Sequence, residues 1–287
     1  IPLRLVGSEM CIRDRYNIAD YQIHDYLMAD SARSYLKAGS RLDVNKLDQE
    51  RDRITQYLQN RGYYRFNKDF ITYQVDTMRN SRNVDLIMQL HPYQRKKEDL
   101  PSQHRQYYIR NVDFMFDVDF AELTSESLKG VDSLRSGEVN FFYKDKLFLR
   151  PQVISDYNYL QSGKLYRNRD VQNTYSALGR LNILKYSNIR FREELEADSA
   201  YLDAYVMLTR NKNKSLSFEI EGTNSAGDLG AAASVAYSHR NLFKGSETFT
   251  IKLRGAYEAV TGLEGYANSN YLEYGVETSL SFPEFMF

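Results

Sequence analysis

Hydrophobic and polar residues follow two different periods along this chain, and the change lies near residue 212. Before that point, apolar residues recur at helical spacing, as at Leu47, Ile54 and Leu58, which predicts amphipathic helices between strands. Beyond it the helical period disappears and apolar and polar residues alternate strictly, which is typical of β-strands. The pattern therefore predicts an α+β amino-terminal part followed by an all-β part.

The first α+β segment is predicted over residues 16–91, in the order strand, helix, helix, strand, strand. Asp43 is a suitable N-cap for the long helix, and Gly62 is suited to end it. Residues 92–106 contain Pro92 and Pro101 and are predicted to be a linker. The five elements of the segment are expected at residues 16–24, 31–37, 43–62, 70–76 and 84–90.

The same order of elements recurs over residues 107–211, interrupted by an insertion at residues 119–145. The sequence Leu36-x-x-Gly39 is matched by Leu160-x-x-Gly163, although the shared order of elements is the stronger sign of a repeat. The elements of this second segment are expected at residues 107–118, 151–160, 170–184, 187–192 and 201–208.

Residues 212–287 predict the first strands of an antiparallel transmembrane β-barrel. In residues 214–222, Leu216, Phe218 and Ile220 lie on one face and serine or glutamate on the other. Strands of this length, apolar on one face and charged on the other, are typical of membrane barrels. Because four strands cannot close a barrel, the chain is expected to stop inside this domain. The four strands are predicted at residues 214–222, 229–237, 248–258 and 271–282.

Composition narrows the classes of protein further. The 287 residues include 38 Lys and Arg against 38 Asp and Glu, and this balance argues against a polybasic nucleic-acid-binding protein. One Cys excludes a disulfide scaffold. The 24 Tyr are consistent with a protein rich in β-strands and with surfaces that are partly exposed to water.

Residues 1–15 do not fit the rest of the chain. The run Met10-Cys11-Ile12-Arg13-Asp14 resembles the in-frame translation of a transposase adapter from sequencing libraries. We expect this stretch to be an artefact and the native amino terminus, with any signal peptide, to be missing.

No catalytic or metal-binding set is recognisable in the sequence. The four His residues are scattered and form neither an HExxH motif nor an i,i+4 pair, and no GxSxG or P-loop motif is present. We expect no enzyme activity, no cofactor and no metal.

Several residues carry a resemblance to a known family. Residues 42–64 with the two following strands resemble a POTRA domain, and residues 163–191 resemble the last such domain before a barrel. The run from Arg240 through Asn241, Leu242 and Phe243 to Gly245 is similar to the first hairpin turn of the BamA/TamA outer-membrane assembly family. The abundance of Tyr and Asn is similar to members from the Bacteroidota. Arg61-Gly62-Tyr63 matches the letters of a late barrel-loop motif of the family, but we interpret it as a helix end.

The resemblance implies a protein that inserts or translocates outer-membrane proteins, with its barrel in the outer membrane of a Gram-negative bacterium and its other domains in the periplasm. The implied partners are unfolded clients, outer-membrane lipids and accessory lipoproteins, with no nucleic acid. Clients would pair with strand edges. Two edges are candidates, the strand of Ile71, Thr72, Tyr73, Gln74 and Val75, and the first barrel strand with Leu216, Phe218 and Ile220.

Three alternatives remain open. A two-partner secretion pore combines the same domains. A barrel can also carry an amino-terminal hydrolase domain lost from this chain, and a soluble adhesion or binding protein would also contain alternating strands.

Overall fold

A computed structural model of the chain describes residues 11–37, 39–77, 83–94, 100–118, 130–196, 199–225, 228–260 and 269–283. The chain forms two compact units that are not contiguous in sequence. The first comprises Ile1–Arg110, Ser162–Val171 and Glu193–Asp203, and the second Asn111–Gln161, Gln172–Arg192 and Ala204–Phe287. The predicted boundaries of consecutive domains, at residues 91, 106 and 211, stay a prediction.

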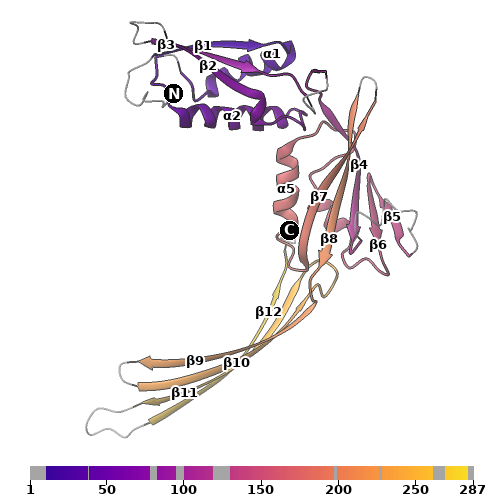
Figure 1. Cartoon of the computed structure of the whole chain (residues 1–287). Helices are drawn as coiled ribbons and strands as arrows, with labels where there is room; N and C mark the ends of the chain where they lie inside the picture. The colour runs from indigo at the N-terminus through magenta and orange to yellow at the C-terminus, as the bar shows by residue number, and fades with distance from the viewer. Residues whose placement is uncertain are drawn as a thin grey trace. The chain divides into compact units, whose positions relative to one another are not determined.

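A three-stranded sheet and two α-helices form the α+β fold of the first segment (Figure 1). The strand order is β1-β3-β2, with β1 parallel and β2 antiparallel to the central β3. The elements are β1 (Cys11–Ile18), α1 (Tyr21–Ala29), the 3-10 turn Ser31–Arg33, α2 (Val44–Gln59), the 3-10 turn Lys68–Phe70, β2 (Ile71–Thr77) and β3 (Asn83–Leu90).

The first strand and first helix lie elsewhere than predicted. Residues 21–29 form α1, where the sequence pattern predicted a strand to residue 24, and only a single 3-10 turn occupies the predicted helix at residues 31–37. The reason is local, because the Asp20 side chain accepts hydrogen bonds from the backbone N–H of Gln22 and Ile23 and caps the helix. Ile23 and Leu27, four residues apart, then face the core together.

Strand β1 includes residues 11–15 of the stretch expected to be an adapter artefact. Backbone hydrogen bonds pair it with β3 over its whole length. Backbone pairing depends little on side-chain identity, so it does not distinguish native residues from an adapter sequence. The adapter origin of residues 11–15 stays a prediction.

The core of this segment lies between the sheet and the helices. Side chains from α1 and α2 pack against strand residues and against two aromatic residues that follow α2. The cluster consists of Ile23, Leu27, Ile54, Leu58, Tyr63, Phe66, Ile71, Met88 and Leu90. Asp43 caps α2 as predicted, by accepting a hydrogen bond from the backbone N–H of Asn45.

A five-stranded sheet in the order β5-β6-β4-β8-β7 contains the second α+β segment. Without the inserted hairpin β5-β6, the strand order of this sheet is β4-β8-β7. This order corresponds to the order β1-β3-β2 of the first segment's sheet. Strands β4, β7 and β8 contribute residues to both compact units. The elements are β4 (Tyr107–Phe116), β5 (Asp132–Ser136), β6 (Val139–Tyr143), α4 (Pro151–Asp156), α5 (Asn168–Leu178), β7 (Leu184–Leu195) and β8 (Ala200–Arg210).

Four long antiparallel strands follow in the order β12-β11-β10-β9 (Figure 1). They are β9 (Lys214–Ser225), β10 (Asp228–Arg240), β11 (Thr248–Val260) and β12 (Ser269–Ser281). The described strands form an open sheet, so the structure shows the predicted strands but no closed barrel. None of the described helices has the length and apolar character that crossing a membrane requires.

Candidate functional site

The first predicted client-binding strand, β2, lies at an edge of its sheet, because it pairs with β3 alone. Its side chains alternate between the two faces. Ile71 is fully buried against the helices, and Thr72 and Gln74 on the other face are exposed. Burial is the main cause that raises the pKa of Tyr73, and the nearby charge of Glu50 adds to the shift.

The backbone of β2 leaves a defined set of groups for a partner. His91 N–H donates to Phe70 O at 2.8 Å, which makes residues 70 and 91 a hydrogen-bonded pair. In an antiparallel ladder such pairs alternate, so Thr72 and Gln74 also bond toward β3. The N–H and C=O groups of Ile71, Tyr73 and Val75 therefore point toward the open edge.

The second predicted strand, β9, is an edge strand of the four-stranded sheet. Leu216, Phe218 and Ile220 share one face and are 57%, 71% and 86% exposed. The register continues this apolar face across the sheet, as in the row from Phe218 through Val235 and Leu253 to Val276. A contiguous exposed apolar surface of this kind indicates contact with lipid or protein.

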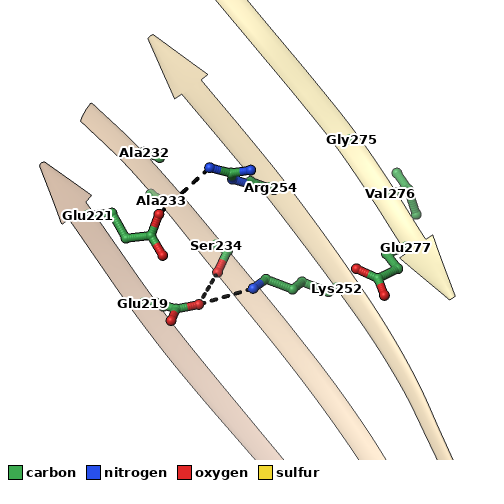
Figure 2. Close-up of a pocket in the computed structure, with 10 residues that line it drawn as sticks. All are labelled: Glu219, Glu221, Ala232, Ala233, Ser234, Lys252, Arg254, Gly275, Val276 and Glu277. Atoms are coloured by element: carbon green, nitrogen blue, oxygen red, sulfur yellow. Dashed lines mark hydrogen bonds and ion pairs between the residues drawn. The ribbon is translucent and has the colours of Figure 1, made fainter. Parts of the chain in front are cut away.

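The opposite face of the same sheet is charged (Figure 2). Lys252 Nζ lies 3.1 Å from Glu219 Oε2, and Arg254 lies 3.7 Å from Glu221. These pairs join β9 to β11 across β10, where Ser234 is small and donates to Glu219 at 3.1 Å. A water-facing surface of this kind on one side of an apolar sheet is typical of a barrel lumen.

The predicted hairpin motif forms the β10–β11 turn, residues 240–247, and much of it is buried. Asn241 Nδ2 donates to Phe148 O at 2.6 Å, and Asn241 Oδ1 accepts from the backbone N–H of Ser246 at 3.0 Å. Ser246 Oγ accepts in turn from the backbone N–H of Ile183 at 3.3 Å. The turn is therefore tied to segments before α4 and before β7, all within the second compact unit.

Glu247 organises the middle of the same turn. Its Oε2 accepts from the backbone N–H groups of Phe243 at 3.1 Å and Gly245 at 3.0 Å, and its Oε1 lies 3.5 Å from Arg150 Nη2. A Cβ atom on Gly245 would lie 2.6 Å from Arg150 Nη2 and would also overlap the Glu247 carboxylate. A side chain at this position would therefore displace the Arg150 guanidinium and the Glu247 carboxylate that holds the turn.

The members of the sequence motif have different environments. Leu242 and Phe243 are 43% and 58% exposed, and Arg240 Nη1 donates to Lys212 O at 3.2 Å. Sequence reasoning missed Phe148, Arg150 and the role of Glu247. Phe148 lies 93 positions from Asn241, and nothing in the local pattern indicates this contact.

Some of the open edges were not predicted. Strand β5 ends the five-stranded sheet on one side and has only five residues, which limits its capacity for pairing. Among the described residues, no cluster of three or more His, Cys, Asp or Glu could hold a metal ion.

No protein-family model and no curated protein matches the chain. Among solved structures, it is similar to BamA from Haemophilus ducreyi lacking POTRA domains 1–3, with 14% identity over 96% of this chain and 47% of that one, at a TM-score of 0.44. It is similar as well to BamA POTRA3–5 from Haemophilus influenzae, with 11% identity over 70% of this chain and 61% of that one, at a TM-score of 0.39. The chain is also similar to CdiB from Acinetobacter baumannii, with 8% identity over 95% of this chain and 49% of that one, at a TM-score of 0.36.

The chain spans about half the length of the BamA structure from Haemophilus ducreyi and of CdiB. All three TM-scores are below 0.5.

Proposed function

We propose that this chain is part of an outer-membrane protein assembly or translocation factor, which binds unfolded client chains by strand addition. The observation that carries the proposal is the sheet of β9–β12. Its strands have 12 or 13 residues, and a span of the hydrocarbon core needs about 9–11. An apolar face opposite a charged one suits lipid on one side and water on the other.

The α+β segments supply the client-binding step. The outward backbone groups of Ile71, Tyr73 and Val75 would bond to an extended client, and main-chain bonding accepts nearly any sequence. The exposed edge of β9 would offer the same pairing beside the lipid-facing residues Leu216, Phe218 and Ile220. Strand addition uses free backbone groups alone, so the proposal involves no enzyme activity and no cofactor. The barrel would lie in the outer membrane, and the α+β segments in the periplasm.

A peptide-binding experiment on the full chain in detergent tests the β2 step. The probe is a fluorescent synthetic peptide of residues 248–260, an alternating strand of the kind a client contains. Val75→Pro removes one outward N–H and leaves the bonds to β3 intact. We expect it to weaken binding, measured by anisotropy, about two- to tenfold, which corresponds to one lost hydrogen bond.

The matched control is Val75→Thr, which changes the side chain and keeps the N–H, and which should bind the peptide like the original chain. Unchanged binding by Val75→Pro would place the client elsewhere. A disulfide cross-link from a cysteine-bearing peptide to a Ser217→Cys variant, made in a Cys11→Ser background, would then test β9.

A further inference from the structure

Four arginines line one groove of the first compact unit, on the side where both α-helices end. The groove has a volume of about 760 Å³. Arg33 follows α1, Arg61 follows α2, and Arg167 and Arg169 come from the segment at the start of α5. Tyr57, Asn60 and Asp30 also line it.

The acidic groups nearby do not balance these arginines. The Asp30 carboxylate is bonded to Arg53, outside the groove, and lies 3.7 Å from Arg33. Arg169 has only a 3.7 Å contact with the adjacent Asp170. Within the described part of the chain, no ion pair joins Arg61 or Arg167 to any acid.

The dipoles of the two helices that end at the groove do not neutralise its four arginines either. The carboxyl ends of α1 and α2 attract cations, but each is equivalent to about half a negative charge. Together they offset roughly one of the four guanidinium groups. The groove therefore keeps a positive excess.

Two contacts hold the arginines in place. The Arg61 guanidinium carbon lies 3.6 Å from the centre of the Tyr57 ring, so the ring fixes its plane and leaves its N–H edges available. Asn60 Oδ1 accepts from the backbone N–H of Arg169 at 2.7 Å, which ties the Arg167–Arg169 segment to the end of α2.

We propose that this groove binds a phosphate group. A carboxylate has two oxygens and is matched by one arginine fork, whereas a phosphate presents three or more and accepts from several forks together. The phosphate can belong to a lipid headgroup or to a free anion, and the two sources share this chemistry.

Calorimetric titration of the full chain in neutral detergent tests the proposal. The probes are inorganic phosphate, dihexanoyl phosphatidic acid, whose phosphate monoester keeps three free oxygens, and, as a carboxylate, succinate. We expect phosphate and the lipid to bind, and succinate to bind at least tenfold more weakly than phosphate. Tighter binding of the lipid than of phosphate would identify a headgroup as the source, and the reverse a soluble anion.

The double variant Arg167→Gln with Arg169→Gln removes two exposed guanidinium groups and keeps the backbone bond to Asn60. We expect it to weaken phosphate binding about tenfold or more. Arg61→Lys keeps the charge and loses the fork, and should also weaken binding. The control, Arg180→Gln with Arg190→Gln, removes the same charge from exposed positions outside the groove and should bind like the original chain.

Three results would overturn the proposal. The first is no binding of either phosphate probe, and the second is succinate binding as tightly as phosphate. The third is equal weakening by the control pair, because it would indicate attraction by net charge alone.

Discussion

Three residues of the β10–β11 turn hold positive φ angles, namely Asn241 at 65°, Lys244 at 60° and Ser246 at 65°. Asparagine tolerates this conformation, but lysine and serine adopt it at a cost of about 1 kcal/mol or more each. The hydrogen bonds that each makes in the turn offset this strain. Lys244 O, for example, accepts from the Arg150 backbone N–H at 2.9 Å.

Asn241→Gly tests the energetic weight of this turn. Glycine keeps the positive φ but leaves Phe148 O and Ser246 N–H buried without their partner. We expect the free energy of unfolding to fall by about 2–4 kcal/mol, measured by urea unfolding followed by tyrosine fluorescence. Leu242→Ala, at the exposed neighbouring position, should change it by less than about 1 kcal/mol. Similar losses from both variants would contradict the assigned hydrogen bonds.

His104 is a second residue whose environment defines its behaviour. Its ring lies between Phe66, Phe70 and Tyr93, with ring centres 5.1, 4.8 and 6.3 Å away, and its Nε2 donates to His91 O at 2.9 Å. Burial lowers the pKa of His104, and the hydrogen bond to the His91 carbonyl and the charge of Asp20 oppose this shift only in part. The folded state therefore favours the neutral form of the His104 ring.

Stability should consequently fall as the pH is lowered. Below the ordinary histidine pKa of about 6.5, the unfolded chain takes up a proton that the folded ring accepts only at lower pH. We expect the free energy of unfolding to decrease from pH 7 to pH 5, and His104→Phe to reduce this dependence. Substituting the neighbouring Gln103 by Ala, which removes no titratable group from the same surroundings, should leave the dependence intact. An unchanged pH profile in His104→Phe would contradict the prediction.

At the scale of elements, local chemistry and periodicity define most helices and strands, but not all. The alternation in residues 214–222 predicted β9 and its two faces, because strict alternation has no helical counterpart. Residues 16–24 alternate as well, yet Asp20 caps the start of α1 there. Ile23 and Leu27 of this helix are then buried in the core. Alternation over a few residues is thus weaker evidence than an N-cap followed by an i,i+4 apolar pair.

The two faces of β9 give a matched pair of substitutions. Phe218→Lys places a charge on the apolar face and Ser217→Lys places it on the charged face one residue away. If the apolar face contacts lipid, Phe218→Lys should cost about 2–4 kcal/mol and Ser217→Lys much less. Urea unfolding in phospholipid vesicles measures both. Equal costs would argue against a lipid-facing surface.

At the scale of the whole molecule, long-range contacts bring together residues that no local pattern connects. The β10–β11 turn meets Phe148 and Ile183, and Gln106 of the predicted linker donates to Arg61 O at 2.7 Å. Tyr93, His104 and Gln106 of the predicted linker are half-buried, whereas its other described residues are exposed. The arginine groove likewise joins three segments of the chain.

The sequence by itself determined the α+β character of the first two segments, the repeated order of their elements and the apolar and charged faces of β9–β12. These properties follow from backbone caps and from the period of the side chains, which act over a few residues. The tertiary structure alone decided that Asn241 contacts Phe148 and which arginines share a groove. Those contacts depend on the packing of segments distant in sequence, which local periodicity does not encode.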